Sequence, residues 1–242
     1  MSKIVRTTIL TCTVFAACAT LGRASDETPA SALDRLRTGN ATFVANASQA
    51  LPVTADQRQA LTKGQHPFAI VLSCADSRVP PEVIFHTGLG ELFVVRVAGE
   101  ALDKSVLASI EYAAEHLHVP ALVVMGHESC GAVKAAIETK PGAASMGPNL
   151  DYLVKNIKPA FARMRTAADA EHLRDAILAN VEQVVNDLLA RSEILTHLHA
   201  TGKLQIAGAY YELESGRVRF SEPVQPTPDV SHASPSAQHQ QR

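Results

Sequence analysis

Short continuous runs of apolar residues predict the strands of this chain. Three such runs lie at residues 68–72, 92–95 and 121–125. Because their apolarity is continuous rather than alternating, they are typical of strands that are buried on both faces, as in parallel sheets. A further strand is predicted over residues 204–213. Residues 218–220, which follow a Glu-Ser-Gly turn, are predicted to form its hairpin partner.

Apolar residues at helical spacing predict helices around these strands. Two N-terminal helices are expected over residues 31–46 and 55–61, and two later ones over residues 150–164 and 173–188. Between the second and third strands, apolar residues three and four positions apart follow Asp103, a typical helix N-cap, and predict a crossover helix. This order predicts an α/β fold, with a mostly parallel β-sheet flanked by helices and an N-terminal helical extension.

The start of the chain has the pattern of an export signal. Two basic side chains precede an acid-free apolar run at residues 9–18, and small residues follow before Asp26, the first acidic residue. The run is well short of the ~20 residues that span a membrane. We therefore interpret residues 1–24 as a secretory signal peptide and expect a periplasmic protein. Phe-Ala-Ala-Cys at residues 15–18 also resembles a bacterial lipobox, in which Cys18 would be retained as a lipid anchor.

The remainder is predicted to be one domain with a polar tail. Residues 25–221 form the domain, and residues 222–242, rich in Pro, Ser, Gln and His, are predicted to be disordered. With 46% hydrophobic and 19% charged residues, the composition is that of a globular protein. The formal net charge is −2, and loss of the signal peptide removes three basic side chains and no acidic one, which leaves −5. Such a charge gives no reason to expect a nucleic-acid partner.

The four cysteines fall into two pairs. Four are too few for a disulfide scaffold in 242 residues, and Cys12 and Cys18 lie in the export signal. Cys74 directly follows the first predicted strand, and His127 and Cys130 follow the third. Since the carboxyl ends of neighbouring parallel strands share one crevice, these three side chains converge if the two strands are adjacent.

Two thiolates and one imidazole form a borderline-soft ligand set that suits zinc. His127 and Cys130, three residues apart, are expected to face the same way at a helix start, where Cys130 would lose its thiol proton more readily. Asp76, two residues after Cys74, could be a fourth ligand or could hold a water in the fourth position. From spacing alone, a disulfide between Cys74 and Cys130, or two inert buried thiols, stays open.

Two motifs carry a resemblance to a known family. Cys-Ala-Asp-Ser-Arg at residues 74–78 and His-Glu-Ser-Cys-Gly at residues 127–131 are similar to the zinc-site signature of β-class carbonic anhydrases. Further similar segments lie at residues 39–43 (Gly-Asn-Ala-Thr-Phe), 90–99 and 109–120. The resemblance extends over residues 30–221.

The resemblance implies a zinc enzyme that reversibly hydrates carbon dioxide to bicarbonate and a proton, through attack of zinc-bound hydroxide. It implies that one zinc ion per chain is held by Cys74, His127 and Cys130. Asp76 would accept a hydrogen bond from the hydroxide, and Arg78 would pair with Asp76 and hold it off the metal. Gln65 stands where plant-type members carry a substrate-side glutamine.

The resemblance also implies a homodimer or homotetramer, in which the N-terminal helices embrace a neighbouring copy and the active-site cleft lies at the interface. The apolar face of Leu33, Leu36 and Phe43 suits that role but would equally suit packing within the chain. Regulated members of the family use a Trp-Arg-Tyr bicarbonate pocket. The chain has no Trp, which favours the constitutively open subtype.

Two residues depart from the family's pattern, and two other functions are compatible with the motifs. Glu100 stands where bacterial relatives commonly carry Asn, and Glu128 adds a negative charge near the predicted metal. One alternative is a carbon disulfide or carbonyl sulfide hydrolase on the same scaffold. The other is a non-catalytic periplasmic zinc-binding protein, in which Asp76 and Arg78 would be dispensable.

Overall fold

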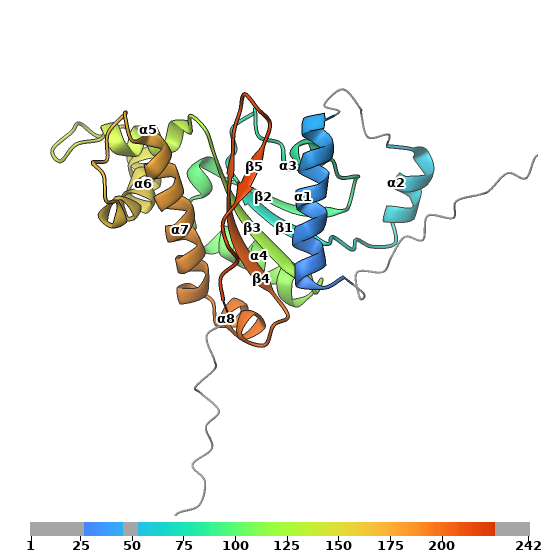
Figure 1. The fold of residues 1–242 in the computed structure, drawn as a ribbon. Coiled ribbons are helices and arrows are strands. Elements are labelled where there is room, and N and C mark those ends of the chain that lie inside the picture. Colours follow the sequence, from blue (N-terminus) through green and yellow to red (C-terminus); the bar gives the residue numbers. More distant parts are fainter. Residues whose placement is uncertain (1–26, 46–52, 226–242) are drawn as a thin grey trace, which may run out of the picture.

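A five-stranded sheet forms the centre of the molecule in a computed structural model that describes residues 27–45 and 53–225 (Figure 1). The strands are β1 (Ala69–Ser73), β2 (Leu92–Arg96), β3 (Ala121–His127), β4 (Gln205–Tyr211) and β5 (Val218–Phe220). Their order in the sheet is β2-β1-β3-β4-β5. The first four strands are parallel, and β5 pairs with β4 in the antiparallel sense. The predicted sheet, its terminal hairpin and the adjacency of β1 and β3 are therefore confirmed.

Helices cover both faces of this sheet (Figure 1). The α-helices are α1 (Pro29–Ala45), α2 (Ala55–Leu61), α3 (Pro81–Ile84), α4 (Lys104–Glu115), α5 (Gly131–Glu138), α6 (Pro148–Ile157), α7 (Leu173–Arg191) and α8 (Glu193–Ala200), of which α2 has no buried residue and lies outside the core. Side chains of α4 and α8 pack with Ile70 and Leu72 on one face, while α1, α3, α5 and α6 pack with Ala69 and Val71 on the other. Helix α7 contributes buried side chains to both clusters. Every residue of β1 and β3 is buried as a result, which explains their continuous apolarity.

The predicted helices are confirmed, with one subdivision. Asp103 caps α4 by accepting hydrogen bonds from the N–H groups of Ser105 and Val106. The helix predicted over residues 150–164 is α6 followed by a 3-10 helix at Lys158–Arg163. A proline at position 159 lacks the N–H that would continue the α-helical pattern, so the geometry changes there. Helix α3 has four residues, too few to show a periodicity.

The apolar face of α1 packs within its own chain. Leu33 and Leu36 are 1% and 0% exposed, and Phe43 packs against the same cluster. A Cβ atom at Gly39 would lie 1.9 Å from the carbonyl oxygen of Phe85, so only glycine permits this approach of helix to backbone. Of the two roles expected for this face, packing within the chain is the one that the structure shows.

Asn40 ties α1 to two distant segments. Its amide nitrogen donates hydrogen bonds to the carbonyl oxygens of Ile84 (3.1 Å) and Gly216 (2.9 Å), and its amide oxygen accepts one from the N–H of Val218 (2.8 Å). Asn40 is 6% exposed, so these bonds satisfy polar groups that water does not reach. Gly39 and Asn40, which interrupt the apolar pattern of α1, are thus the residues that fix this helix: Gly39 permits its close approach and Asn40 supplies the hydrogen bonds.

The predicted signal peptide, with Cys12 and Cys18, lies outside the described residues, and so does the predicted tail beyond Gln225. In residues 27–45 and 53–225, no helix combines the length and the apolarity needed to cross a membrane.

Candidate metal centre

Cys74, His127 and Cys130 come together at the carboxyl ends of β1 and β3. The two strands are adjacent, with Ser73 beside Met125, so the chain leaves both strands at the same edge of the sheet. The ligand atoms of the three side chains all lie within 4.8 Å of one another, and all three residues are buried. Both cysteines are free thiols. The predicted convergence is confirmed, and the two cysteines are not joined as a disulfide.

The local geometry differs from the one expected for His127 and Cys130. His127 is the last residue of β3, and Cys130 is the extended N-cap residue of α5, so the two do not share a helix start. They meet because the turn between them is tight: Ser129 has a φ angle of 57°, in the left-handed region that non-glycine residues seldom adopt. Such a conformation is typical of functional sites. The expectation of a common helical face was wrong because the strand extends through His127.

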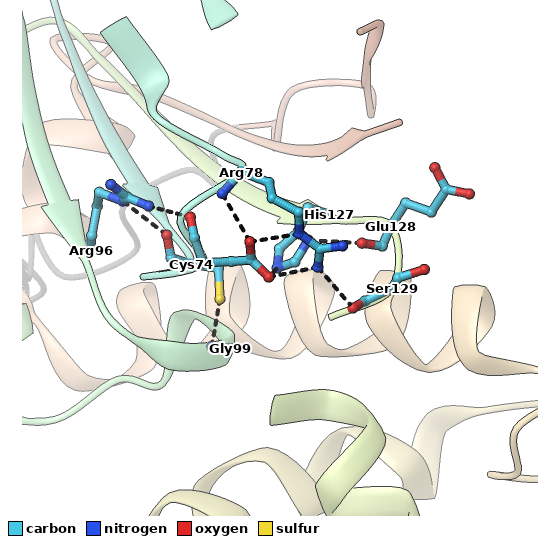
Figure 2. A network of polar contacts seen from close by, with 8 residues as sticks. Cys74, Arg78, Arg96, Gly99, His127, Glu128 and Ser129 are labelled. Carbon is cyan, nitrogen blue, oxygen red and sulfur yellow. Dashed lines mark hydrogen bonds and ion pairs between the residues drawn. The ribbon is translucent and has the colours of Figure 1, made fainter. Parts of the chain in front are cut away.

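The imidazole of His127 is oriented for a metal. Its Nδ1 lies 2.8 Å from the carbonyl oxygen of Glu128, which can only accept a hydrogen bond, so Nδ1 carries the proton (Figure 2). Nε2 is therefore left with its lone pair free. This atom is buried and has no hydrogen-bond partner among the described residues. A buried nitrogen without a partner, directed at two sulfur atoms, fits a metal ligand.

The two thiols differ in how readily they ionise. A hydrogen bond from Cys130 lowers the pKa of Cys74, and the N–H of Gly99, 3.4 Å from the Cys74 Sγ, also stabilises its thiolate. The same bond to Cys74, together with burial, raises the pKa of Cys130. One thiolate is therefore stabilised by the protein alone, and the second needs a cation beside it. The donor set fits a soft divalent ion such as zinc.

Asp76 is held by Arg78. The guanidinium donates from Nε to Oδ1 (2.9 Å) and from Nη2 to Oδ2 (2.7 Å), and the backbone N–H of Arg78 donates to Oδ1 (3.0 Å). These side-chain bonds keep the pKa of Asp76 far below its usual range, so its carboxyl group is ionised. Its Oδ2 lies 3.9 Å from Nε2 of His127. Asp76 therefore borders the three-residue cluster with both oxygens engaged by Arg78, and is not a fourth member of it.

Arg96 is a residue of this centre that the sequence patterns do not single out. It ends β2 and lies beside Ser73 in the register of the sheet. Its Nε donates to the carbonyl oxygen of Cys74 (3.0 Å), and its Nη2 donates to that of Asp76 (Figure 2). It thereby fixes the backbone that carries both residues. The sequence signal is that a basic side chain ends the strand next to β1.

Two further residues lie apart from the cluster. Gln65 is exposed in the loop before β1, whereas Cys74 follows the other end of that strand. Gln65 and Cys74 of the same chain therefore lie at opposite ends of β1. The side chain of Glu128 points away from Cys74 in Figure 2, and its Oε2 accepts a hydrogen bond from the N–H of Leu213 (2.9 Å). Glu128 thus links the His127 turn to the chain after β4 and does not line the metal cluster.

Known proteins are similar to this chain in sequence and in fold. The family described as carbonic anhydrase matches residues 69–218. "Carbonic anhydrase 2" of Mycobacterium tuberculosis is 40% identical over 189 residues, which cover 78% of this chain and 91% of that protein. The solved structure of a Coccomyxa β-carbonic anhydrase in complex with acetazolamide is similar with a TM-score of 0.61 and 26% identity, over 80% of this chain and 88% of that one. A structure from work on two tetrameric β-carbonic anhydrases of Sordaria macrospora has a TM-score of 0.60 and 24% identity, over 79% and 98% of the two chains.

Proposed function

This chain belongs to the β-class carbonic anhydrase family, and on that basis we propose that Cys74, His127 and Cys130 hold one zinc ion as the centre of its activity. The protein is a zinc-dependent carbonic anhydrase, which reversibly hydrates carbon dioxide to bicarbonate and a proton. The observation that carries the ligand assignment is the buried cluster itself: two free thiols and an unpartnered imidazole nitrogen within 4.8 Å of one another.

Zinc, when bound, supplies a Lewis acid that makes a water molecule acidic enough to lose a proton near neutral pH. The two thiolates of Cys74 and Cys130 offset the charge of the cation more than neutral imidazoles would. The polar groups around the cluster consequently have a larger share in setting the acidity of that water.

Asp76 orients the attacking oxygen. As an ionised carboxylate it accepts hydrogen bonds and donates none, so an O–H group must point toward it and leave a lone pair free for the carbon of carbon dioxide. Arg78 engages both oxygens of Asp76 and so keeps them off the metal. Because of this pairing, and because the chain has no Trp for a regulatory bicarbonate pocket, we assign it to the constitutively open subtype.

Gln65 would serve the substrate site of a second copy of this chain. The five residues of β1 extend over about 16 Å at about 3.3 Å each, farther than a glutamine side chain reaches, and they lie between Gln65 and Cys74. A homodimer or homotetramer in which one copy supplies Gln65 to its neighbour satisfies this geometry. The tetrameric β-carbonic anhydrases of Sordaria macrospora, which have the same fold, support such an assembly.

Mixing two impaired variants tests this arrangement. In a mixed dimer of Gln65→Ala and Asp76→Asn chains, one site regains both native side chains if Gln65 acts on the neighbour. The mixture is then expected to be more active than either variant alone. If Gln65 served its own chain, no site would hold both side chains and the mixture would show no recovery. Light scattering of the wild type gives the number of copies.

We also propose that the protein is periplasmic, supported by the acid-free apolar run at residues 9–18. Mass spectrometry of the mature protein tests this. A chain that starts near residue 25 supports cleavage by signal peptidase, and a lipidated N-terminal Cys18 supports anchoring to the membrane instead. A full-length chain that retains residues 1–24 would overturn export.

Stopped-flow hydration assays together with metal analysis test the ligand assignment. About one zinc per chain, with Cys74 and Cys130 resistant to thiol reagents until zinc is removed, is the expected result. A metal-free chain with an oxidised Cys74–Cys130 pair that still hydrates carbon dioxide would contradict it. Turnover of carbon disulfide or carbonyl sulfide is not favoured, since the relatives that match are carbonic anhydrases.

A further inference from the structure

Glu100 is a buried carboxyl group that the proposed function leaves unused. It ends the 3-10 turn Ala98–Glu100, which follows β2, and its side chain is 0% exposed. Oε2 lies 3.4 Å from the amide nitrogen of Asn180 on α7, while Oε1 has no hydrogen-bond partner among the described residues. A buried carboxyl group with so few partners is costly and calls for an explanation.

The turn that carries Glu100 contacts a zinc ligand. Gly99 and Glu100 both have left-handed φ angles, 60° and 51°, which is a strained conformation for glutamate. This conformation directs the N–H of Gly99 to the Sγ atom of Cys74, at 3.4 Å. On the far side of the turn, Asn180 donates to the carbonyl oxygen of Gly99 at 2.9 Å. One buried amide thus holds both the peptide of Gly99 and the carboxyl group of Glu100.

The surroundings of Glu100 favour its uncharged form. The elements around it present the thiols of Cys74 and Cys130 and the amide of Asn180, and no basic side chain among the described residues bonds to it. Burial raises the pKa of Glu100 well above its usual value, and the negative charge of Cys74 raises it further. A neutral carboxyl group can accept from Asn180 without placing a third negative charge beside the two sulfur atoms.

We propose that Glu100 is a positioning residue of the zinc site. Together with Asn180 it fixes the Gly99 turn, so that the N–H of Gly99 donates to the thiolate of Cys74. The inference rests on the assignment of Cys74 as a zinc ligand. Residues that orient a metal ligand without contacting the metal typically weaken metal affinity by about 10- to 100-fold when they are removed.

Zinc affinity of substituted holoenzymes tests the proposal, by competition with a chromogenic chelator. Glu100→Gln keeps a side chain of the same shape whose oxygen can still accept a hydrogen bond from Asn180, so its zinc dissociation constant is expected to stay within about threefold of the wild type. Glu100→Met removes the polar contact and is expected to raise the constant by about tenfold or more. The cobalt-substituted protein gives a second signal, since the thiolate-to-cobalt absorption band of Glu100→Met should shift while that of Glu100→Gln should not.

Two controls separate positioning from a general loss of stability. Asn40→Leu removes another buried polar contact, made to Ile84 and Gly216 rather than to the cluster or the Gly99 turn. It should lower stability while leaving zinc affinity and the cobalt band unchanged. Asn180→Ala acts on the same turn from α7, so it should weaken zinc binding even if Glu100→Met does not fold. The double variant of Glu100 and Asn180 should lose no more affinity than the worse single variant, because the two residues act as one unit.

Three results would overturn the proposal. The first is wild-type zinc affinity in both Glu100→Met and Asn180→Ala. The second is a loss of zinc affinity in Glu100→Gln equal to that in Glu100→Met. The third is a loss of zinc affinity in Asn40→Leu as large as that in Glu100→Met. The ligand assignment is tested separately: full zinc content in Cys74→Ser would contradict that assignment, whatever the Glu100 variants show.

Discussion

The guanidinium of Arg78 donates hydrogen bonds to both carboxylate oxygens of Asp76, at 2.9 and 2.7 Å. Parallel bonds of this kind fix the plane of the carboxylate as well as its charge. The Arg78 side chain is half exposed, whereas Cys74, His127 and Cys130 are buried. The pair therefore sets both the ionisation and the direction of the Asp76 carboxylate beside Cys74, His127 and Cys130.

Asp76→Asn should lower kcat/KM for carbon dioxide hydration by about 100-fold, because an amide can donate a hydrogen bond where the carboxylate only accepts. Stopped-flow assays at saturating zinc measure the effect. Asp169→Asn is the matched control, since Asp169 is also held by a single basic partner, His172, but in the exposed loop before α7. Equal rates in Asp76→Asn and Asp169→Asn would show that Asp76 takes no part in the reaction.

Arg78→Met should narrow the pH range of activity from the acid side. The hydrogen bond from Arg78 is the main cause of the lowered pKa of Asp76, so its loss raises that pKa. The carboxylate works only when ionised, so activity is present above this pKa and disappears as the pH falls through it. The acid limb of the rate profile should move to higher pH, with a loss of about tenfold or more at neutral pH. An unchanged limb would show that Arg78 does not control Asp76.

Cys74→Ser and His127→Ala should each abolish stoichiometric zinc binding. Two remaining ligands cannot hold the ion with the affinity of three, and elemental analysis of the purified variants measures the loss. In the wild type, chelation should lower the melting temperature, because an ion present at about 100 times its dissociation constant adds about 2.7 kcal/mol to stability. His172→Ala, which alters a partly exposed histidine outside the cluster, should retain zinc. Loss of zinc in that control would point to a metal site elsewhere.

Glu100→Gln should stabilise the protein increasingly as the pH rises. The pKa of Glu100 in the folded protein is raised well above the value of 4.5 expected in the unfolded chain. The contribution of Glu100 to stability is therefore fully present below the unfolded-state pKa and is lost as the pH rises through the folded-state pKa. Glutamine does not titrate, so the difference in free energy of unfolding between variant and wild type should grow in favour of the variant. Urea unfolding between about pH 5 and pH 8 measures it. A difference that does not change with pH would show that Glu100 ionises alike in the folded and unfolded chains.

Gly39→Ala should destabilise the fold by about 3 kcal/mol. The added Cβ would lie 1.9 Å from the carbonyl oxygen of Phe85, so α1 or the backbone near α3 must move. Gly131→Ala is the matched control, because a Cβ there meets nothing within 4 Å, and it should be neutral or slightly stabilising. Chemical denaturation compares the two, and similar stability in both would show that α1 does not pack where the structure places it.

The pattern of apolar residues is sufficient to predict the sheet. Strands β1 and β3 are buried on both faces, and this burial requires the continuous apolar runs that are visible in their sequences. The convergence of Cys74, His127 and Cys130 was also predictable, since it needs only two adjacent parallel strands and the residues at their ends. The path between His127 and Cys130 was not, because it depends on the left-handed conformation of Ser129, for which a serine gives no signal.

The residues that support the ligands were harder to predict because their contacts are set by the tertiary structure. Arg96 reaches the carbonyl oxygens of Cys74 and Asp76 from a neighbouring strand, and Asn180 reaches the Gly99 turn from α7. Neither contact follows from spacing along the chain. Glu100 could be noticed as a departure from the family's pattern, but only its burial and its proximity to two thiols give that departure a physical meaning.

The residues proposed to hold the metal are far apart in the sequence, with more than fifty residues between Cys74 and His127. Of the three proposed ligands, only His127 and Cys130 are close together in an unfolded chain, and Cys74 joins them when β1 and β3 pair. A molecule that holds zinc through all three residues is therefore one in which β1 and β3 have paired. The metal-to-protein ratio of a preparation gives a lower limit for the fraction of chains that have reached this arrangement.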